Sequence, residues 1–356
     1  CRQIIDIPEP QPIEVVEHQV EKGWCEACRQ WHTPEVKWPA SVGQGRMGER
    51  LTGLVGYMRS FLRLPYRLIQ AFLEGVYRLK VSVGELVNLS QKVEQELSGE
   101  VLHIKKETRA SPTVHMDETG WRENGQNGYI WCMVADTPQP VRYFEYHRSR
   151  AGQVVQSMLG EDFKGVVVSD FYSAYNIYQG LHQRCWVHLL RDLSELRKEY
   201  PESGAIVAWC VGVKNLYYMA RDMMDNPDKE EYERGTPKDN FASLTNKIYV
   251  MGMMYASEKG HPCQALAKRL LRHMDELFQF VVHPDLAPDN NLAERSLRSL
   301  VVQRKISGGS RSSDGSQTTM RLATLFQTWS ARGLSPLFEC WRLLGYQPVW
   351  AISTEV

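Results

Sequence analysis

The chain has 356 residues, of which 43% are hydrophobic and 10% aromatic. This length exceeds one ordinary core, so we expect two or three globular domains. The 42 basic and 42 acidic side chains give a net charge of zero, which argues weakly against a nucleic-acid binder. No apolar run is long enough to span a membrane and no signal peptide is recognisable. We therefore expect a cytoplasmic protein without membrane contact, whose eight cysteines are reduced thiols or metal ligands.

Residues 1–45 form a pattern of short extended segments punctuated by proline and glycine. Cys25 and Cys28 supply two thiolates at the spacing of a zinc knuckle, whereas a structural Zn²⁺ site needs four ligands. His18 and His32 could complete the set, but nothing in the spacing selects them. We therefore predict a partial zinc-binding-like module, with two incidental free cysteines as the alternative.

Residues 46–98 change to a helical pattern, in which Leu51, Leu54 and Met58 recur at three- and four-residue spacing. Two short helices are expected to follow over 66–73 and 81–89, and the second has Ser82 as its N-cap. This arrangement predicts a helix-turn-helix-like DNA-binding segment. A small helical bundle that serves as a spacer is the alternative.

Residues 98–112 are polar and end in Ser-Pro, which predicts a linker. Beyond it, three strands in meander order and then strands that alternate with helices indicate an α/β catalytic core with a mixed sheet of the ribonuclease-H type. The expected strands are 113–117, 128–135, 141–147, 165–170 and 183–188, and the expected helices are about 151–159, 172–178 and 189–200. The predicted core covers 113–200 and 286–335, with a helical insertion at 201–285 and a C-terminal tail at 336–356.

Three acidic residues stand where metal-dependent chemistry would need them. Asp117 and Asp170 each end a β-like run, and the carboxyl ends of strands are where α/β sheets place ligands. Glu294 lies one turn into a helix whose start is signalled by Pro288-Asp289-Asn290. Such a carboxylate set suits two Mg²⁺ or Mn²⁺ ions, which can clamp both sides of an in-line phosphoryl displacement. Ordinary strand-end aspartates and a Glu294–Arg298 surface ion pair are the alternative.

The stretch from Glu294 to Arg321 is locally basic, with six arginine or lysine residues against two acidic ones. A basic stretch beside an acidic site is what a phosphate backbone needs. The side chains predicted to bind DNA are Arg298, Arg304, Lys305 and Arg311.

Several segments in this order resemble the DDE transposases of the insertion sequence 66 family, and the resemblance covers nearly the whole chain. They are 114–121, 169–175, Cys185-Trp186-Val187-His188, 290–298 and 304–312. The resemblance implies a ribonuclease-H-like core with a helical insertion, a zinc-binding module and a helix-turn-helix-like segment. It also implies metal-dependent DNA strand cleavage and strand transfer at the ends of a mobile element.

The resemblance further implies that Asp117, Asp170 and Glu294 are the catalytic carboxylates. Cys185 and His188 match a Cys-x-x-His element, for which we favour a structural role as a buried thiol and a hydrogen-bonded histidine at a strand-to-helix turn. The family has a second Cys-x-x-Cys pair upstream, where this sequence has only its opening cysteine. We therefore expect the chain to begin inside the zinc module.

The partners that the resemblance implies are transposon-end and target DNA, a second copy of the chain in a homodimer on paired ends, and small accessory transposition proteins in the bacterial cytoplasm. Two other functions stay open. One is a catalytically inactive DNA-binding regulator derived from a transposase, which the intact acidic set argues against. The other is a ribonuclease-H-like nuclease that cuts without joining, whose core would be the same.

Overall fold

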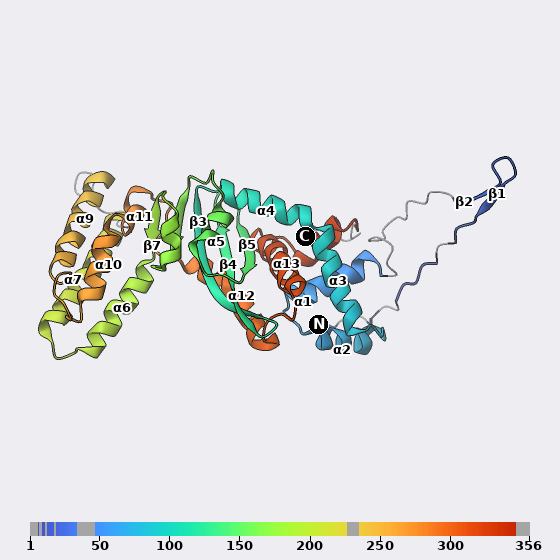
Figure 1. Ribbon diagram of the computed structural model, residues 1–356, viewed down its shortest axis with the longest axis horizontal. Helices are drawn as coiled ribbons and strands as arrows, with labels where there is room; N and C mark the ends of the chain where they lie inside the picture. The colour runs from blue at the N-terminus through green and yellow to red at the C-terminus, as the bar shows by residue number, and fades with distance from the viewer. Residues whose placement is uncertain are drawn as a thin grey trace, which may run out of the picture. The chain divides into compact units, whose positions relative to one another are not determined.

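The computed structural model describes residues 6, 9–10, 13–17, 19–33, 47–225 and 235–346 (Figure 1). Contacts divide the chain into two compact units, which are Cys1–Val101 with Ser312–Val356, and Leu102–Arg311. Within the described ranges, no helix combines the length and the apolar character needed to cross a membrane.

The helices of the first unit are α1 (Glu49–Ser60), α2 (Tyr66–Tyr77), α3 (Val83–Glu96), α13 (Ser313–Ala331) and α14 (Pro336–Leu343). The predicted cap of α3 is confirmed, because the Ser82 hydroxyl accepts a hydrogen bond from the Glu85 backbone N–H at 3.1 Å. Val55, Ile69 and Leu86 bring α1, α2 and α3 together in one apolar core. The apolar spacing read from the sequence therefore marks the faces that are buried.

A short antiparallel hairpin precedes these helices. It consists of β1 (Gly23–Cys25) and β2 (Gln30–His32), with Trp24 paired opposite Trp31. The two indole rings meet edge to face with centroids 5.7 Å apart. This hairpin carries Cys25, whereas the candidate ligand His18 lies outside the described residues.

The linker predicted at 98–112 is wrong, because Ser98–Ala110 form the helix α4. Val101, Ile104 and Thr108 follow one another at helical spacing and are buried. The Thr108 hydroxyl also donates to the Ile104 carbonyl at 2.7 Å. Because many charged residues lie between these positions, the narrow buried face of α4 is not apparent from the sequence.

The second unit is built on a five-stranded mixed sheet in the order β5-β4-β3-β6-β7. The strands are β3 (Thr113–Glu123), β4 (Gln126–Ala135), β5 (Val141–His147), β6 (Val166–Ser169) and β7 (His182–Arg184). The first three form an antiparallel meander, and β6 and β7 extend the sheet in parallel from β3. The mixed α/β class is confirmed, but β7 ends before Cys185 because a helix begins at Trp186.

The remaining elements of this unit are mostly helical. They are α5 (Gly152–Leu159), the 3-10 helix η1 (Ser173–Ile177), α6 (Trp186–Glu199), α7 (Gly204–Asp225), α9 (Pro237–Met253), α10 (Gln264–Arg272), the 3-10 helix η2 (Met274–Glu276), α11 (Gln279–Val282) and α12 (Asn291–Ser307). In Figure 1, α7, α9 and α10 lie together beyond α6. Trp209, Leu244 and Leu270 fill the core among them. Residues 201–285 are thus largely helical, as expected.

The predicted core at 286–335 does not stay in one unit. Helix α12 belongs with the sheet, whereas α13 packs with α1, α3 and α14 in the first unit. Phe326 of α13 meets Tyr57 of α1 edge to face, with ring centroids 6.1 Å apart. The apolar face of α13 therefore completes the helical core rather than the sheet.

Candidate active site

The register of one strand pair brings Asp117 and Asp170 side by side. Strands β3 and β6 pair in parallel up to His115 opposite Val168. Asp117 and Asp170 each lie two residues beyond this last pair, and they are close enough for the Asp170 charge to raise the pKa of Asp117. Asp170 follows the last residue of β6, as predicted. Asp117 does not end its strand, because β3 continues in antiparallel pairing with β4.

Glu294 is held near these aspartates by the residue that precedes α12. The buried Asn290 side chain donates to the Met116 carbonyl at 2.7 Å, and its Oδ1 lies 3.3 Å from His115 Nδ1. Helix α12 packs on β3 and β4, and Glu294 lies in its first turn. Asn290 therefore fixes the helix start against the strand that carries Asp117. The sequence marked Asn290 only as a helix-start signal.

The electrostatics of Asp117 reflect a crowded acidic site. Burial and the negative charges of Glu118, Asp170 and Glu294 together raise the pKa of Asp117 to about 8, although the Glu118 backbone N–H acts in the opposite direction. Both other predicted carboxylates thus act on Asp117. Two groups of metal-ligand side chains among the described residues have donor atoms within 4.8 Å of one another. The carboxylate oxygens of Asp117, Asp170 and Glu294 do not form such a compact group.

Glu118 stands next to Asp117 but is committed to other partners. Its side chain accepts hydrogen bonds from the Tyr175 hydroxyl and from Arg150 Nε, the latter at 2.9 Å. The Arg150 guanidinium in turn lies 4.0 Å from the ring centroid of Tyr172. Burial raises the pKa of Glu118, while Tyr175 and Arg150 lower it. Of the two neighbouring acids, Asp117 is therefore the one left for a cation.

A buried arginine holds the backbone at Asp170. Arg184 Nη1 donates to the Asp170 carbonyl at 2.8 Å and to the Ser169 hydroxyl at 3.2 Å, and Nη2 donates to the Asn176 side chain at 2.7 Å. Its Nε pairs with Glu276. Burial would raise the pKa of Glu276, but hydrogen bonds from His273 and Arg184 and the arginine charge hold it at about 2. The local sequence around Arg184 carries no signal of this role.

The predicted DNA-binding residues fall into two groups. Arg298, Lys305 and Arg311 are exposed. Arg304 is half-buried and donates to the Gly120 carbonyl. Only the first three present their charges freely to a large ligand such as DNA. Arg304 instead ties α12 to β3.

The Cys-x-x-His element lies against Glu294. The prediction of a buried thiol is confirmed, because Cys185 is buried and its Sγ accepts from the Asn290 backbone N–H at 3.2 Å. Burial raises the pKa of this thiol to about 11. The prediction of a hydrogen-bonded histidine is wrong, because His188 Nδ1 is buried without a hydrogen-bond partner. His188 Nε2 lies 3.7 Å from Glu294 Oε1.

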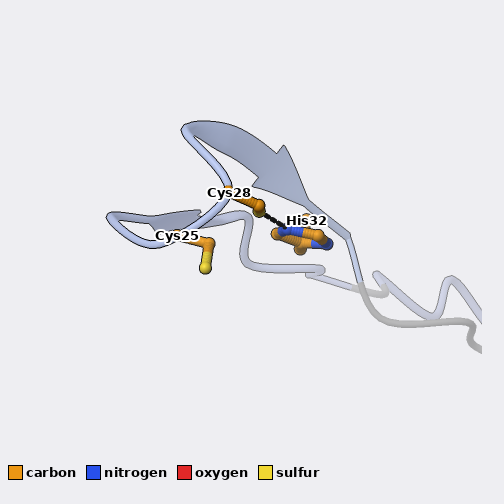
Figure 2. A group of neighbouring side chains, drawn as sticks. All are labelled: Cys25, Cys28 and His32. Atoms are coloured by element: carbon orange, nitrogen blue, oxygen red, sulfur yellow. Dashed lines mark hydrogen bonds between the residues drawn. The ribbon is translucent and has the colours of Figure 1, made fainter.

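The hairpin of the first unit brings three metal-ligand side chains together. Cys25, Cys28 and His32 offer donor atoms within 4.8 Å of one another (Figure 2). Cys28 Sγ lies 2.8 Å from His32 Nε2. Hydrogen bonds from the Cys28 and Ala27 backbone and from the Cys28 side chain lower the pKa of Cys25. The fold thus selects His32, which spacing alone did not.

Most of the chain matches a known protein family. The family model described as "Transposase IS66 family" matches residues 44–318. The chain is also 29% identical over 181 residues to the uncharacterized protein y4jO of Sinorhizobium fredii (strain NBRC 101917 / NGR234), covering 51% of each protein. It is 23% identical over 228 residues to the uncharacterized protein y4qI of the same strain, covering 59% of this chain and 42% of that protein. The matches thus span about half or less of these relatives. The family match covers most of the chain, which therefore belongs to the IS66 family of transposases.

Proposed function

We propose that the chain cleaves DNA strands at the ends of an insertion sequence and joins them to a target, with Asp117, Asp170 and Glu294 as catalytic carboxylates. The observation that carries this proposal is the β3–β6 register, whose last pair, His115 opposite Val168, lies two residues before Asp117 and Asp170. The bond from Asn290 to the Met116 carbonyl supports it, because it holds the start of α12 beside β3. Three segments far apart in the sequence thus bring one acid each to one end of the parallel strand pair.

The sheet supports a ribonuclease-H-like core as part of this proposal. A three-stranded antiparallel meander continues into two parallel strands, which is the mixed arrangement expected from the sequence. Helix α12 packs on β3 and β4 and brings the third acid. The buried Arg184 of β7 pairs with the half-buried Glu276 of η2, which follows α10 in the insertion. Within this proposed core, Arg184 and Asn290 are positioning residues.

The carboxylates fit a divalent metal. The raised pKa of Asp117 reflects burial among other negative charges, which a cation would offset. One carboxylate oxygen of Glu294 is buried without a hydrogen-bond partner. Mg²⁺ and Mn²⁺ prefer such oxygen ligands, so we propose that Asp117, Asp170 and Glu294 hold them. When bound, these ions supply positive charge to the attacking and departing oxygens of a phosphoryl transfer.

The hairpin donors Cys25, Cys28 and His32 fit a different ion. Two thiolates and an imidazole are ligands that Zn²⁺ prefers, and the lowered pKa of Cys25 favours its thiolate form. We propose that this hairpin binds zinc through these three residues and one further ligand. It would form the zinc-binding module of a protein that acts as a homodimer on paired DNA ends.

The proposal is tested by cleavage of a labelled insertion-sequence end with Mg²⁺, with Mn²⁺ and with chelator. We expect nicking with either ion, at least about a hundredfold above the rate with chelator, because the acids need a cation to act on phosphate. A joining assay with paired ends and target DNA follows. Binding without cleavage would instead favour the inactive regulator, and cleavage without joining would favour the nuclease.

Exposed basic residues near the site are expected to contribute to DNA affinity through phosphate contacts. Replacing Arg298 or Lys305 by Gln should weaken binding to all sequences alike. Each change should also reduce the slope of log affinity against log salt by about 1, because one fewer counterion is released. The measurement is fluorescence anisotropy over a salt series. Arg304→Gln is the matched control, since its guanidinium is bound to Gly120, and an equal slope change there would contradict this assignment.

A further inference from the structure

A second metal-ligand group lies beside the proposed catalytic carboxylates and shares one of them. Cys185, His188 and Glu294 offer donor atoms within 4.8 Å of one another. Cys185 immediately precedes α6, His188 lies in its first turn, and Glu294 lies in the first turn of α12. We propose that these three residues bind a thiophilic divalent cation such as Zn²⁺, and that this binding inhibits the Mg²⁺-dependent reaction.

The donor set selects a soft or borderline ion. Zn²⁺ takes thiolate, imidazole and carboxylate ligands, and many zinc sites use three protein ligands with a fourth position open. Mg²⁺ prefers oxygen ligands alone and gains nothing from Cys185 or His188. The thiol loses its proton to solvent when the metal binds, because a coordinated cysteine is a thiolate. The same carboxylate of Glu294 can therefore serve two ions of different kinds.

The geometry is close to that of a zinc site. The 3.7 Å between His188 Nε2 and Glu294 Oε1 is too long for a hydrogen bond. It is near the roughly 3.4 Å that separates two ligands around a tetrahedral ion with bonds of about 2.1 Å. Glu294 Oε1 and His188 Nδ1 are both buried without hydrogen-bond partners. A buried polar atom without a partner is costly, and an ion at this position would satisfy the Glu294 oxygen.

The two helix starts that carry the donors are tied together. Cys185 Sγ accepts a hydrogen bond from the Asn290 backbone N–H at 3.2 Å, and the Trp186 backbone N–H donates to the Pro288 carbonyl at 3.0 Å. The backbones at Cys185 and Asn290 are thus fixed against each other before any ion binds. Only side-chain adjustments are needed to close the three donors on a cation.

Inhibition follows from the sharing of Glu294. The carboxylate that the proposed function assigns to Mg²⁺ would be drawn toward Cys185 and His188 when Zn²⁺ occupies the second group. The site itself does not depend on that proposed function, whereas the inhibition rests on it. The two parts therefore need separate measurements.

The site is tested with Co²⁺ as a spectroscopic probe for Zn²⁺. The full chain carrying Cys25→Ser and Cys28→Ser removes the hairpin thiolates. We expect this protein to show a thiolate-to-cobalt charge-transfer band, which is lost in Cys185→Ser and much reduced in His188→Asn. His188→Asn serves if the serine variant does not fold, since the buried Nδ1 atom of His188 has no hydrogen-bond partner to lose. Cys210→Ser, which removes another buried thiol, is the matched control and should keep the band. Absence of the band, or its survival in both site variants, would overturn the site.

The inhibition is tested by cleavage assays with Mg²⁺ and rising Zn²⁺, in the otherwise unchanged chain and in Cys185→Ser. Both proteins keep the hairpin thiolates, so that site affects them equally. We expect the Zn²⁺ concentration that halves each protein's own rate to rise about tenfold or more in Cys185→Ser. Equal sensitivity of the two proteins would overturn the inhibition. Absence of any Mg²⁺-dependent cleavage would overturn the proposed function, and the cobalt spectra would still decide the site.

Discussion

Replacing Asp117 by Asn is expected to reduce Mg²⁺-dependent cleavage by about a thousandfold or more. A loss of that size corresponds to about 4 kcal/mol of transition-state stabilisation. Asparagine keeps the shape of the side chain but removes the charge that holds a divalent ion. The measurement is single-turnover cleavage of a labelled element end, and DNA binding by the same variant should be retained because the exposed cations of α12 are unchanged.

A folding defect would mimic this loss, so the stability of the variant is part of the prediction. Asp117 is buried among Glu118, Asp170 and Glu294, whose charges disfavour its ionised form. Removing the charge should therefore leave the metal-free fold at least as stable as the original, as measured by urea unfolding. Asp162→Asn is the matched control, since Asp162 is exposed on the same unit and should cleave normally. Undiminished cleavage by Asp117→Asn would rule out the carboxylate assignment.

Two of the three acids of the candidate site lie in the local structure that their sequence predicts. Asp170 ends a run of valines, and Glu294 follows a helix-start signal, so chain-local patterns are enough to find both. Asp117 was found for a partly wrong reason, since its strand continues to Glu123. Asp117 lies just beyond the point where the parallel pairing of β3 with β6 ends. The sequence of one strand alone does not show where that pairing ends.

The residues that hold the site in place were missed for a related reason. Arg184 and Glu276 are 92 positions apart, and Asn290 and Met116 are 174 apart. Local periodicity indicates which face of a helix or strand is buried. It does not indicate which polar group from a distant part of the sequence will contact that face. Arg184 is fully buried, yet an arginine in a short polar strand reads as a surface residue.

The same limit explains the errors in the fold. The sequence of α4 resembles a linker because few of its residues are buried, namely Val101, Ile104 and Thr108. The predicted core range 286–335 includes α13, whose apolar face packs instead with α1, α3 and α14. Whether a segment forms a helix or a strand depends mainly on its local sequence. Which element it packs against depends on the apolar faces of all the other elements in the fold.

Replacing Arg184 by Met is expected to destabilise the second unit by about 3–5 kcal/mol, the usual cost of removing one partner from a buried ion pair. The change leaves the Asp170 carbonyl and the Asn176 side chain without the guanidinium donor, and it leaves Glu276 with His273 as its remaining partner. Urea unfolding at about pH 7 measures the loss. Arg197→Met is the matched control, since Arg197 is an exposed cation on α6, and should cost within about 0.5 kcal/mol. A similar small cost at Arg184 would show that its bonds are not structural.

The pH dependence of that difference identifies its cause. The pKa of Glu276 is about 2 in the folded chain against an ordinary 4.5, held down by His273 and Arg184 against the effect of burial. A depressed carboxyl pKa stabilises the fold above the unfolded value, and this contribution is lost as pH falls from about 4.5 through about 2. The gap between the original chain and Arg184→Met should therefore be largest above about pH 5 and shrink in acid. A gap that stays constant down to about pH 3 would mean that Arg184 acts through its neutral acceptors, Ser169, Asn176 and the Asp170 carbonyl, and not through the charge of Glu276.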